Sequence, residues 1–142
     1  MTEPPIRGEA GPLYSVGAIA VGTVLGSLAA GAVMLWLNYR NLGYPALANR
    51  VAALGGVLYL IIIGIASLLP NDPLLGVAFI ALQTGIAYWT ATALQAKAIA
   101  YHQQQGGAMH SLARGALVGF LAGITVIFAM LLIGTLLASF TA

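Results

Sequence analysis

Residues 115–140, GALVGFLAGITVIFAMLLIGTLLASF, contain no charged residue. About 20 consecutive apolar residues are enough for a helix to cross the hydrocarbon core of a bilayer. Because lipid offers no hydrogen-bond partner, every backbone amide in that core must be paired within the chain, and a helix does so. We therefore expect this stretch to be a transmembrane helix.

Three further apolar runs precede this one, at about residues 13–37, 51–69 and 74–94. None shows the alternation of apolar and polar residues that is typical of the strands of a membrane β-barrel. The sequence therefore predicts an all-α, polytopic membrane protein with a four-transmembrane-helix bundle. The bundle forms a single domain over residues 13–142, and residues 1–12 are expected to form a flexible polar tail.

The composition points to lipid as the solvent of this chain. It has 142 residues, of which 61% are hydrophobic and 6% charged, and its mean hydropathy is +0.98. Soluble domains carry roughly 25% charged residues, so this chain lacks the polar groups to cover a water-facing surface. The net charge of +2 is too small to attract nucleic acid. The chain has no cysteine, which excludes disulfides and thiolate chemistry.

The placement of the basic residues predicts the orientation in the membrane, because short cytoplasmic loops are enriched in Lys and Arg. Four of the five basic residues lie in or beside two polar hairpins, and these are Arg40, Arg50, Lys97 and Arg114. Only Arg7 lies on the opposite side of a four-crossing topology. We therefore expect a multi-pass protein of the cell inner (plasma) membrane, with both hairpins in the cytoplasm and both termini outside it.

The two polar hairpins share an order of features. Asn38-Tyr39-Arg40 is followed by Gly43 and Arg50, and Ala100-Tyr101-His102 is followed by Gly106-Gly107 and Arg114. One interpretation is a pair of tandem helical hairpins that arose by duplication. The other is that any cytoplasmic hairpin uses Tyr, Gly and Arg for anchoring and turning.

The opening Leu13-Tyr14-Ser15, the glycine-rich run after it and the hairpin Asn38-Tyr39-Arg40-Asn41-Leu42-Gly43 form a recognisable series. This series resembles a family of small bacterial membrane proteins with four spans. The resemblance implies a bacterial inner-membrane protein. It implies no activity and transfers no functional residue to this chain.

Small residues recur every four positions in the first and last apolar runs. The first series is Ala18, Gly22, Gly26 and Ala30, and the second is Gly115, Gly119 and Gly123. In lipid, small residues let helix backbones approach closely enough for dispersion contacts. Each series is therefore expected to be a helix-packing face. The two faces pack on one another within a chain, or each forms a seam with another copy or a partner.

Few side chains in the apolar runs are able to carry chemistry. Gln83 lies near the middle of its run, and its amide needs a partner on another helix. No ionisable residue lies within an expected hydrocarbon core, which argues against proton-coupled transport. His102 and His110 share a hairpin without a carboxylate, an incomplete set for a metal. We therefore expect no catalytic residue, cofactor or metal site, and no enzymatic activity.

The function that these patterns favour is that of a non-enzymatic accessory protein or subunit. It would act through intramembrane helix–helix association with a larger complex or with its own copies. The alternative is a small homo-oligomeric transporter or channel for an uncharged or lipophilic substrate. A transporter should have a polar track that faces one cavity, whereas an accessory subunit should have a lipid-exposed stripe of small residues and no cavity.

Overall fold

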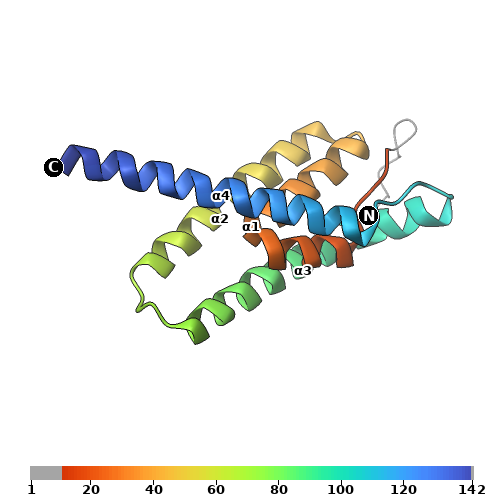
Figure 1. Ribbon diagram of the computed structural model, residues 1–142. Coiled ribbons are helices and arrows are strands. Elements are labelled where there is room, and N and C mark those ends of the chain that lie inside the picture. Colours follow the sequence, from red (N-terminus) through yellow and green to blue (C-terminus); the bar gives the residue numbers. More distant parts are fainter. Residues whose placement is uncertain (1–10, 142) are drawn as a thin grey trace.

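The computed structural model describes residues 11–141, which form four helices and, within that range, no strand beyond the isolated bridge between Leu13 and Met109 (Figure 1). The helices are α1 (Val16–Asn41), α2 (Pro45–Ser67), α3 (Pro73–Gln104) and α4 (Leu112–Thr141). Each is long and apolar enough to cross a membrane. The prediction of an all-α membrane protein with four helices is therefore confirmed.

The helices reach further than the apolar runs, because their caps lie in the flanking polar segments. Pro45 and Pro73 start α2 and α3, in the first turn where a missing N–H costs least. Asp72 accepts a 2.7 Å hydrogen bond from the N–H of Leu74 and caps α3. Ser111 accepts from the N–H of Arg114 at 3.2 Å and caps α4. The predicted polar tail, residues 1–12, lies outside the described residues except for its last two.

Helix α1 is folded back on itself near its middle. In a continuous helix residues 14 and 38 would be about 36 Å apart along the axis. Instead, the N–H of Tyr14 donates to Oδ1 of Asn38 at 2.7 Å, and Nδ2 of Asn38 donates to the carbonyl of Tyr14 at 2.9 Å. The break lies at Gly26 and Ser27, which both have non-helical backbone angles. Helix α1 thus consists of two antiparallel arms, residues 16–25 and 28–41.

Residues 13–37 therefore do not form the one straight helix that the apolar run indicates. Arms of ten and fourteen residues are about 15 and 21 Å long, shorter than a hydrocarbon core of about 30 Å. Neither arm alone spans a bilayer, and the chain leaves the hairpin on the side at which it entered. The physical reason is the non-helical backbone at Gly26 and Ser27, which hydropathy does not report because both residues lie within an apolar run.

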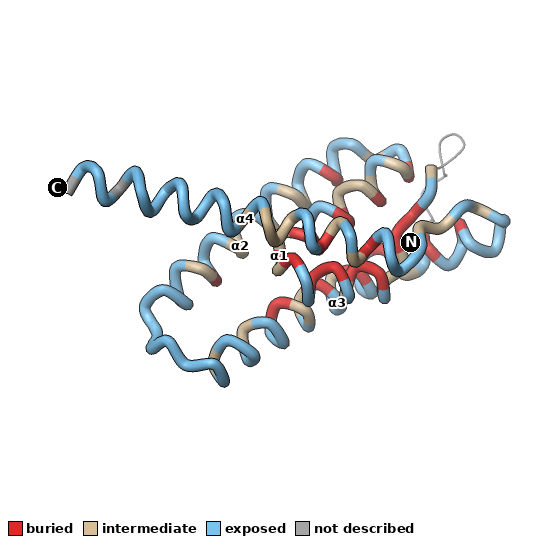
Figure 2. The backbone as a smooth tube through the Cα atoms, in the orientation of Figure 1, coloured by how far each residue is buried: buried red, intermediate tan, exposed pale blue. Residues whose placement is uncertain are grey.

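The doubled α1 is the centre of the molecule. It packs against each of the other three helices, while α2, α3 and α4 make little or no contact with one another. Burial follows this arrangement, with most buried residues on α1 and on the facing side of α3, and exposed residues on the far halves of α2, α3 and α4 (Figure 2). The tandem-hairpin interpretation does not describe this arrangement, because α1 is doubled and α3 is continuous.

Residues 11–14 lie beside the loop that joins α3 to α4. The N–H of Leu13 donates to the carbonyl of Ala108 at 3.1 Å, and the N–H of His110 donates to the carbonyl of Leu13 at 2.8 Å. We call this end of the bundle, with the loops 42–44 and 105–111, the loop end. Helix α4 runs from it to the opposite end (Figure 1). The described N-terminal residues and the C-terminal end of α4 therefore lie at opposite ends, unlike the expected arrangement.

Candidate functional site

The break in α1 places irregular backbone in the interior of a membrane bundle. Gly26 has φ −124° and ψ 15°, and Ser27 has φ 65° and ψ −177°. Non-helical backbone at membrane depth is tolerated where protein buries it or where it lines a cavity. Here α4 buries it, because a Cβ placed on Gly26 would lie 2.7 Å from the carbonyl carbon of Gly119. Glycine at position 26 is thus required by a close approach of two backbones.

Gln83 on α3 forms a hydrogen bond with the backbone at the break in α1. Its Oε1 accepts a 3.0 Å hydrogen bond from the N–H of Leu28, the first residue of the second arm. The first N–H groups of any helix lack partners within the helix, and in hydrocarbon such a group needs a protein acceptor. The sequence indicated that the amide of Gln83 needs a partner on another helix. In the structure that partner is the backbone at the hairpin tip.

The conformation of Ser27 gives a testable consequence. Its backbone angles lie in a region that glycine occupies almost alone, at a cost of roughly 1–3 kcal/mol for other residues. Its hydroxyl oxygen is also buried with no hydrogen-bond partner among the described residues. Ser27→Gly should therefore raise the free energy of unfolding by about 1 kcal/mol, measured by thermal unfolding in detergent. Ser27→Ala, which keeps the strained backbone, should bring a smaller gain; a larger gain from alanine would contradict the strain.

The two series of small residues face each other within one chain. A Cβ on Gly22 would lie 2.8 Å from the carbonyl oxygen of Gly115, and one on Gly119 would lie 2.7 Å from Cα of Gly22. Gly115 and Gly123 meet the carbonyl oxygens of Ala18 and Leu25 in the same way. Of the two expected arrangements, packing within the chain is thus the one present. Ala30 does not extend the first series, because it lies on the second arm.

A buried polar cluster holds the two arms together at the loop end. Asn38 and Gln95 are both 0% exposed. Besides its two bonds to Tyr14, Asn38 donates to Oε1 of Gln95 at 2.9 Å, and Nε2 of Gln95 donates to the carbonyl of Leu35 at 3.0 Å. This cluster, Tyr14–Asn38–Gln95, ties the start of the first arm, the end of the second arm and α3 into one network.

The sequence reasoning missed Asn38 and Gln95, because both lie in polar segments just outside the apolar runs. A signal was present on α3, where the buried residues follow a helical period: Gln83, Ala87, Ala91, Gln95, Ile99 and His102. This series contains two glutamines and a histidine, so a search for apolar residues alone passes over it. Its polar members form hydrogen bonds to α1 or to the loop between α3 and α4. Its alanines permit a close approach of α1 and α3.

The two histidines make separate contacts in the loop between α3 and α4. Nε2 of His102 lies 3.0 Å from the carbonyl oxygen of Ala108, while the ring of His110 lies 4.3 Å from the ring of Tyr14. Burial and then the charge of Arg114 lower the pKa of His110. In residues 11–141 no three His, Cys, Asp or Glu side chains come together as metal ligands. His110 instead contacts residues 13 and 14, and His102 contacts the loop that they lie beside.

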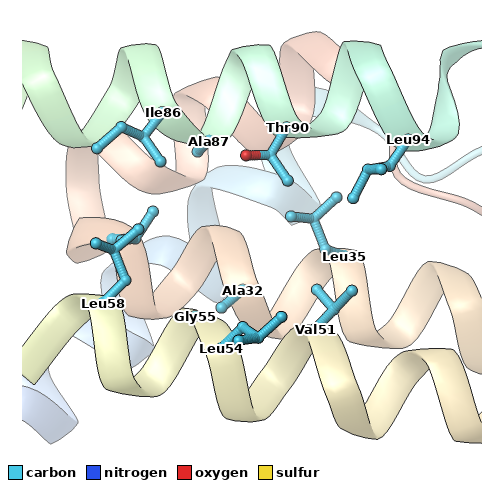
Figure 3. Close-up of a pocket in the computed structure, with 11 residues that line it drawn as sticks. Ala32, Leu35, Val51, Leu54, Gly55, Leu58, Ile86, Ala87, Thr90 and Leu94 are labelled. Carbon is cyan, nitrogen blue, oxygen red and sulfur yellow. The ribbon is translucent and has the colours of Figure 1, made fainter.

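An apolar cavity of about 150 Å³ lies between the second arm of α1, α2 and α3 (Figure 3). Its lining residues are Leu28, Ala32, Leu35, Val51, Leu54, Gly55, Leu58, Ile86, Ala87, Thr90 and Leu94. Thr90 is the only polar residue among them, and its side chain points into the space between the helices (Figure 3). The side-chain amides of Asn38, Gln83 and Gln95, by contrast, are used in bonds between helices.

Comparison with protein-family models, with curated proteins and with solved structures finds no match for this chain.

Proposed function

We propose that this chain is a non-enzymatic membrane subunit that acts through helix contacts with a larger complex or with its own copies. The observation that carries the proposal is the division of its glycines into two groups. Around the hairpin tip, glycines are in close contact with other backbones. On the outer surfaces of α2, α3 and α4, five glycines would meet nothing within 4 Å if they carried a Cβ: Gly56, Gly64, Gly76, Gly85 and Gly134.

The five glycines with no atom near a Cβ lower the stability of their helices, and packing within this chain does not offset that cost. Glycine in a helix interior is about 1 kcal/mol less favourable than alanine. In membranes, glycine favours sites where a second helix approaches closely. Gly64 and Gly134 lie on the far halves of α2 and α4, where the helices separate from the core. These surfaces are suited to a partner helix, and the internal series of small residues is already occupied.

Co-purification in mild detergent followed by mass spectrometry tests this proposal. Gly64→Leu and Gly134→Leu should reduce the co-purified partner, or the self-association, at least tenfold, since close approach at each glycine supports binding by more than about 1.4 kcal/mol. Neither variant should lower the melting temperature of the isolated chain. Ala53→Leu on α2 serves as a control at an exposed position. If both glycine variants keep their partner at the wild-type level, these surfaces face lipid only.

A small homo-oligomeric transporter or channel for an uncharged or lipophilic substrate is the second candidate, and the broken helix favours it. Discontinuous helices form the substrate sites of many transporters, since their free backbone groups can face a ligand. Against it, the first free N–H of the second arm is taken by Gln83, and the cavity has one polar residue. Uptake of a panel of uncharged solutes into proteoliposomes separates the candidates.

The position of the basic residues supports an orientation with the loop end in the cytoplasm. Arg40, Arg50, Lys97 and Arg114 lie toward that end. The four basic residues of the described part of the chain are then on one side, as expected for a cytoplasmic face. We propose that the N-terminal segment is cytoplasmic and that the C-terminal end of α4 lies outside, in an inner membrane.

Single cysteines distinguish this topology from four crossings, and the chain has no cysteine of its own. In intact cells an impermeant thiol reagent should label Asn71→Cys and leave Pro12→Cys and Gln104→Cys unlabelled. Four crossings would put residues 12 and 71 on the same side, so equal labelling of these two variants would refute the re-entrant hairpin. After the membrane is permeabilised, all three variants should be labelled, which controls for access to the thiol.

A further inference from the structure

The apolar cavity between α1, α2 and α3 has features that the proposed function does not use. Its walls are α2 at residues 51–58 and α3 at residues 86–94, and the second arm of α1 closes its back (Figure 3). Helices α2 and α3 make little or no contact with one another, so neither closes the side of the cavity that faces away from α1. An opening toward lipid in an apolar wall admits hydrocarbon.

The size of the cavity decides which kind of hydrocarbon fits. An apolar cavity of about 150 Å³ accepts an object the size of one benzene ring. A helix, with a diameter of about 10 Å, is too wide to enter. The cavity is narrow because α2 approaches α1 closely at Gly55, where a Cβ would lie 2.6 Å from Cβ of Ala32. A segment of one acyl chain fits this space, and a second copy of this chain does not.

Two basic residues flank the cavity on the side of the loop end. Arg50 precedes Leu54 by four residues on α2, and Lys97 follows Leu94 by three on α3, so each shares a helix face with the residue that lines the cavity. Both are exposed. Asp72, the single acidic residue within residues 11–141, lies in the turn at the opposite end. Both positive charges therefore lack an acidic partner in the described part of the chain.

The depth of these two residues suits a lipid headgroup. From Arg50 to the end of α2 at Ser67 is about 26 Å, and from the start of α3 at Pro73 to Lys97 is about 36 Å. These lengths bracket the thickness of a hydrocarbon core, about 30 Å. Arg50 and Lys97 thus lie near the boundary between hydrocarbon and headgroups, with the cavity one to two helical turns below them.

We propose that this cavity binds one acyl chain of an anionic phospholipid, whose phosphate is held by Arg50 and Lys97. The cavity supplies the apolar contact, and the two cations select the charge of the headgroup. The site is distinct from the open glycine surfaces on the outer faces of α2 and α4. It would therefore be present whether the protein acts as a subunit or as a transporter.

Native mass spectrometry in mild detergent tests this site with two probes that share their acyl chains, dioleoyl phosphatidylglycerol and dioleoyl phosphatidylcholine. One phosphatidylglycerol per chain should be retained. In Arg50→Gln/Lys97→Gln its affinity should fall about fivefold for each charge removed, toward that of phosphatidylcholine. Arg114→Gln, which removes a charge from α4 on the same side, should leave the affinity unchanged. Equal retention of both lipids by the wild type would overturn the headgroup assignment.

Filling the cavity tests the assignment of the acyl chain. Thr90→Phe should abolish retention of both lipids, whereas Leu60→Phe, at an exposed position on α2, should not. Because Thr90→Phe also changes the packing between α2 and α3, a second measurement uses the wild-type cavity. With Trp89→Phe, Trp36 next to Leu35 is the only tryptophan. Brominated phosphatidylglycerol should quench its fluorescence at lower lipid concentration than brominated phosphatidylcholine. Identical quenching curves, or lipid retained by a folded Thr90→Phe, would overturn the site.

Discussion

Gly119→Leu should unfold the centre of this molecule. A Cβ at position 119 would lie 2.7 Å from Cα of Gly22 and closer still to the carbonyl oxygen of that residue. These neighbours are backbone atoms and cannot move aside as a flexible side chain can. Overpacking in well-packed cores costs about 1–3 kcal/mol and occasionally more, and we expect about 3 kcal/mol or more here. Thermal unfolding and size-exclusion chromatography in detergent would show the loss.

The matched control for this substitution lies on the same helix. Gly134→Leu introduces the same side chain into α4, at a position where a Cβ meets nothing within 4 Å. Leucine is a better helix former than glycine, so the isolated chain with Gly134→Leu should be as stable as the wild type or more so. Equal stability of the two variants would mean that α4 does not pack on the first arm of α1.

The existence and the type of the helices were predictable from the sequence. Uncharged apolar runs that are long enough for a bilayer leave little choice of structure, since lipid demands internal pairing of the backbone. The ends of the helices were less predictable. The third apolar run ends near residue 94, yet α3 continues to Gln104, because a helix can extend beyond the hydrocarbon into water.

The reversal of α1 was not predictable from hydropathy or from the spacing of small residues. A series at every fourth position assumes one unbroken helix, and Ala18, Gly22, Gly26 and Ala30 fit that assumption in sequence. The break depends on the backbone of Ser27 and on two contacts from distant segments, those of Gln83 and Gly119. Such contacts are tertiary and have no counterpart in the local sequence.

The candidate site was predicted in part. Gln83 was identified because a lone amide in an apolar run needs a partner, and the physical reason holds whatever that partner is. Asn38 was missed because it lies close to Arg40, where a polar residue is ordinarily attributed to a loop. The reversal of α1 brings Tyr14 to Asn38, and this contact turns a polar helix end into a buried cluster.

Asn38→Leu should separate the two arms of α1 at the loop end. The substitution removes three hydrogen bonds, two of them to the backbone N–H and carbonyl of Tyr14, which lose their partners, and one to Oε1 of Gln95. A buried polar group left unpaired costs about 1–3 kcal/mol. We expect a total loss of about 3–5 kcal/mol, which thermal unfolding in detergent would measure. Exchange of the Tyr14 amide hydrogen should become much faster in the same variant.

Asn41→Leu is the matched control, because it makes the same change one turn further along the same arm. The side chain of Asn41 makes a single bond to the carbonyl of Pro12, at an exposed position, where water can replace it. Its loss should cost less than about 1 kcal/mol. Gln95→Leu allows a double-mutant cycle with Asn38→Leu, in which residues of one network show a coupling energy of about 0.5–3 kcal/mol. If Asn38→Leu is no more destabilising than Asn41→Leu, the Tyr14–Asn38–Gln95 cluster does not hold the hairpin, and α1 would be free to open into a single crossing helix.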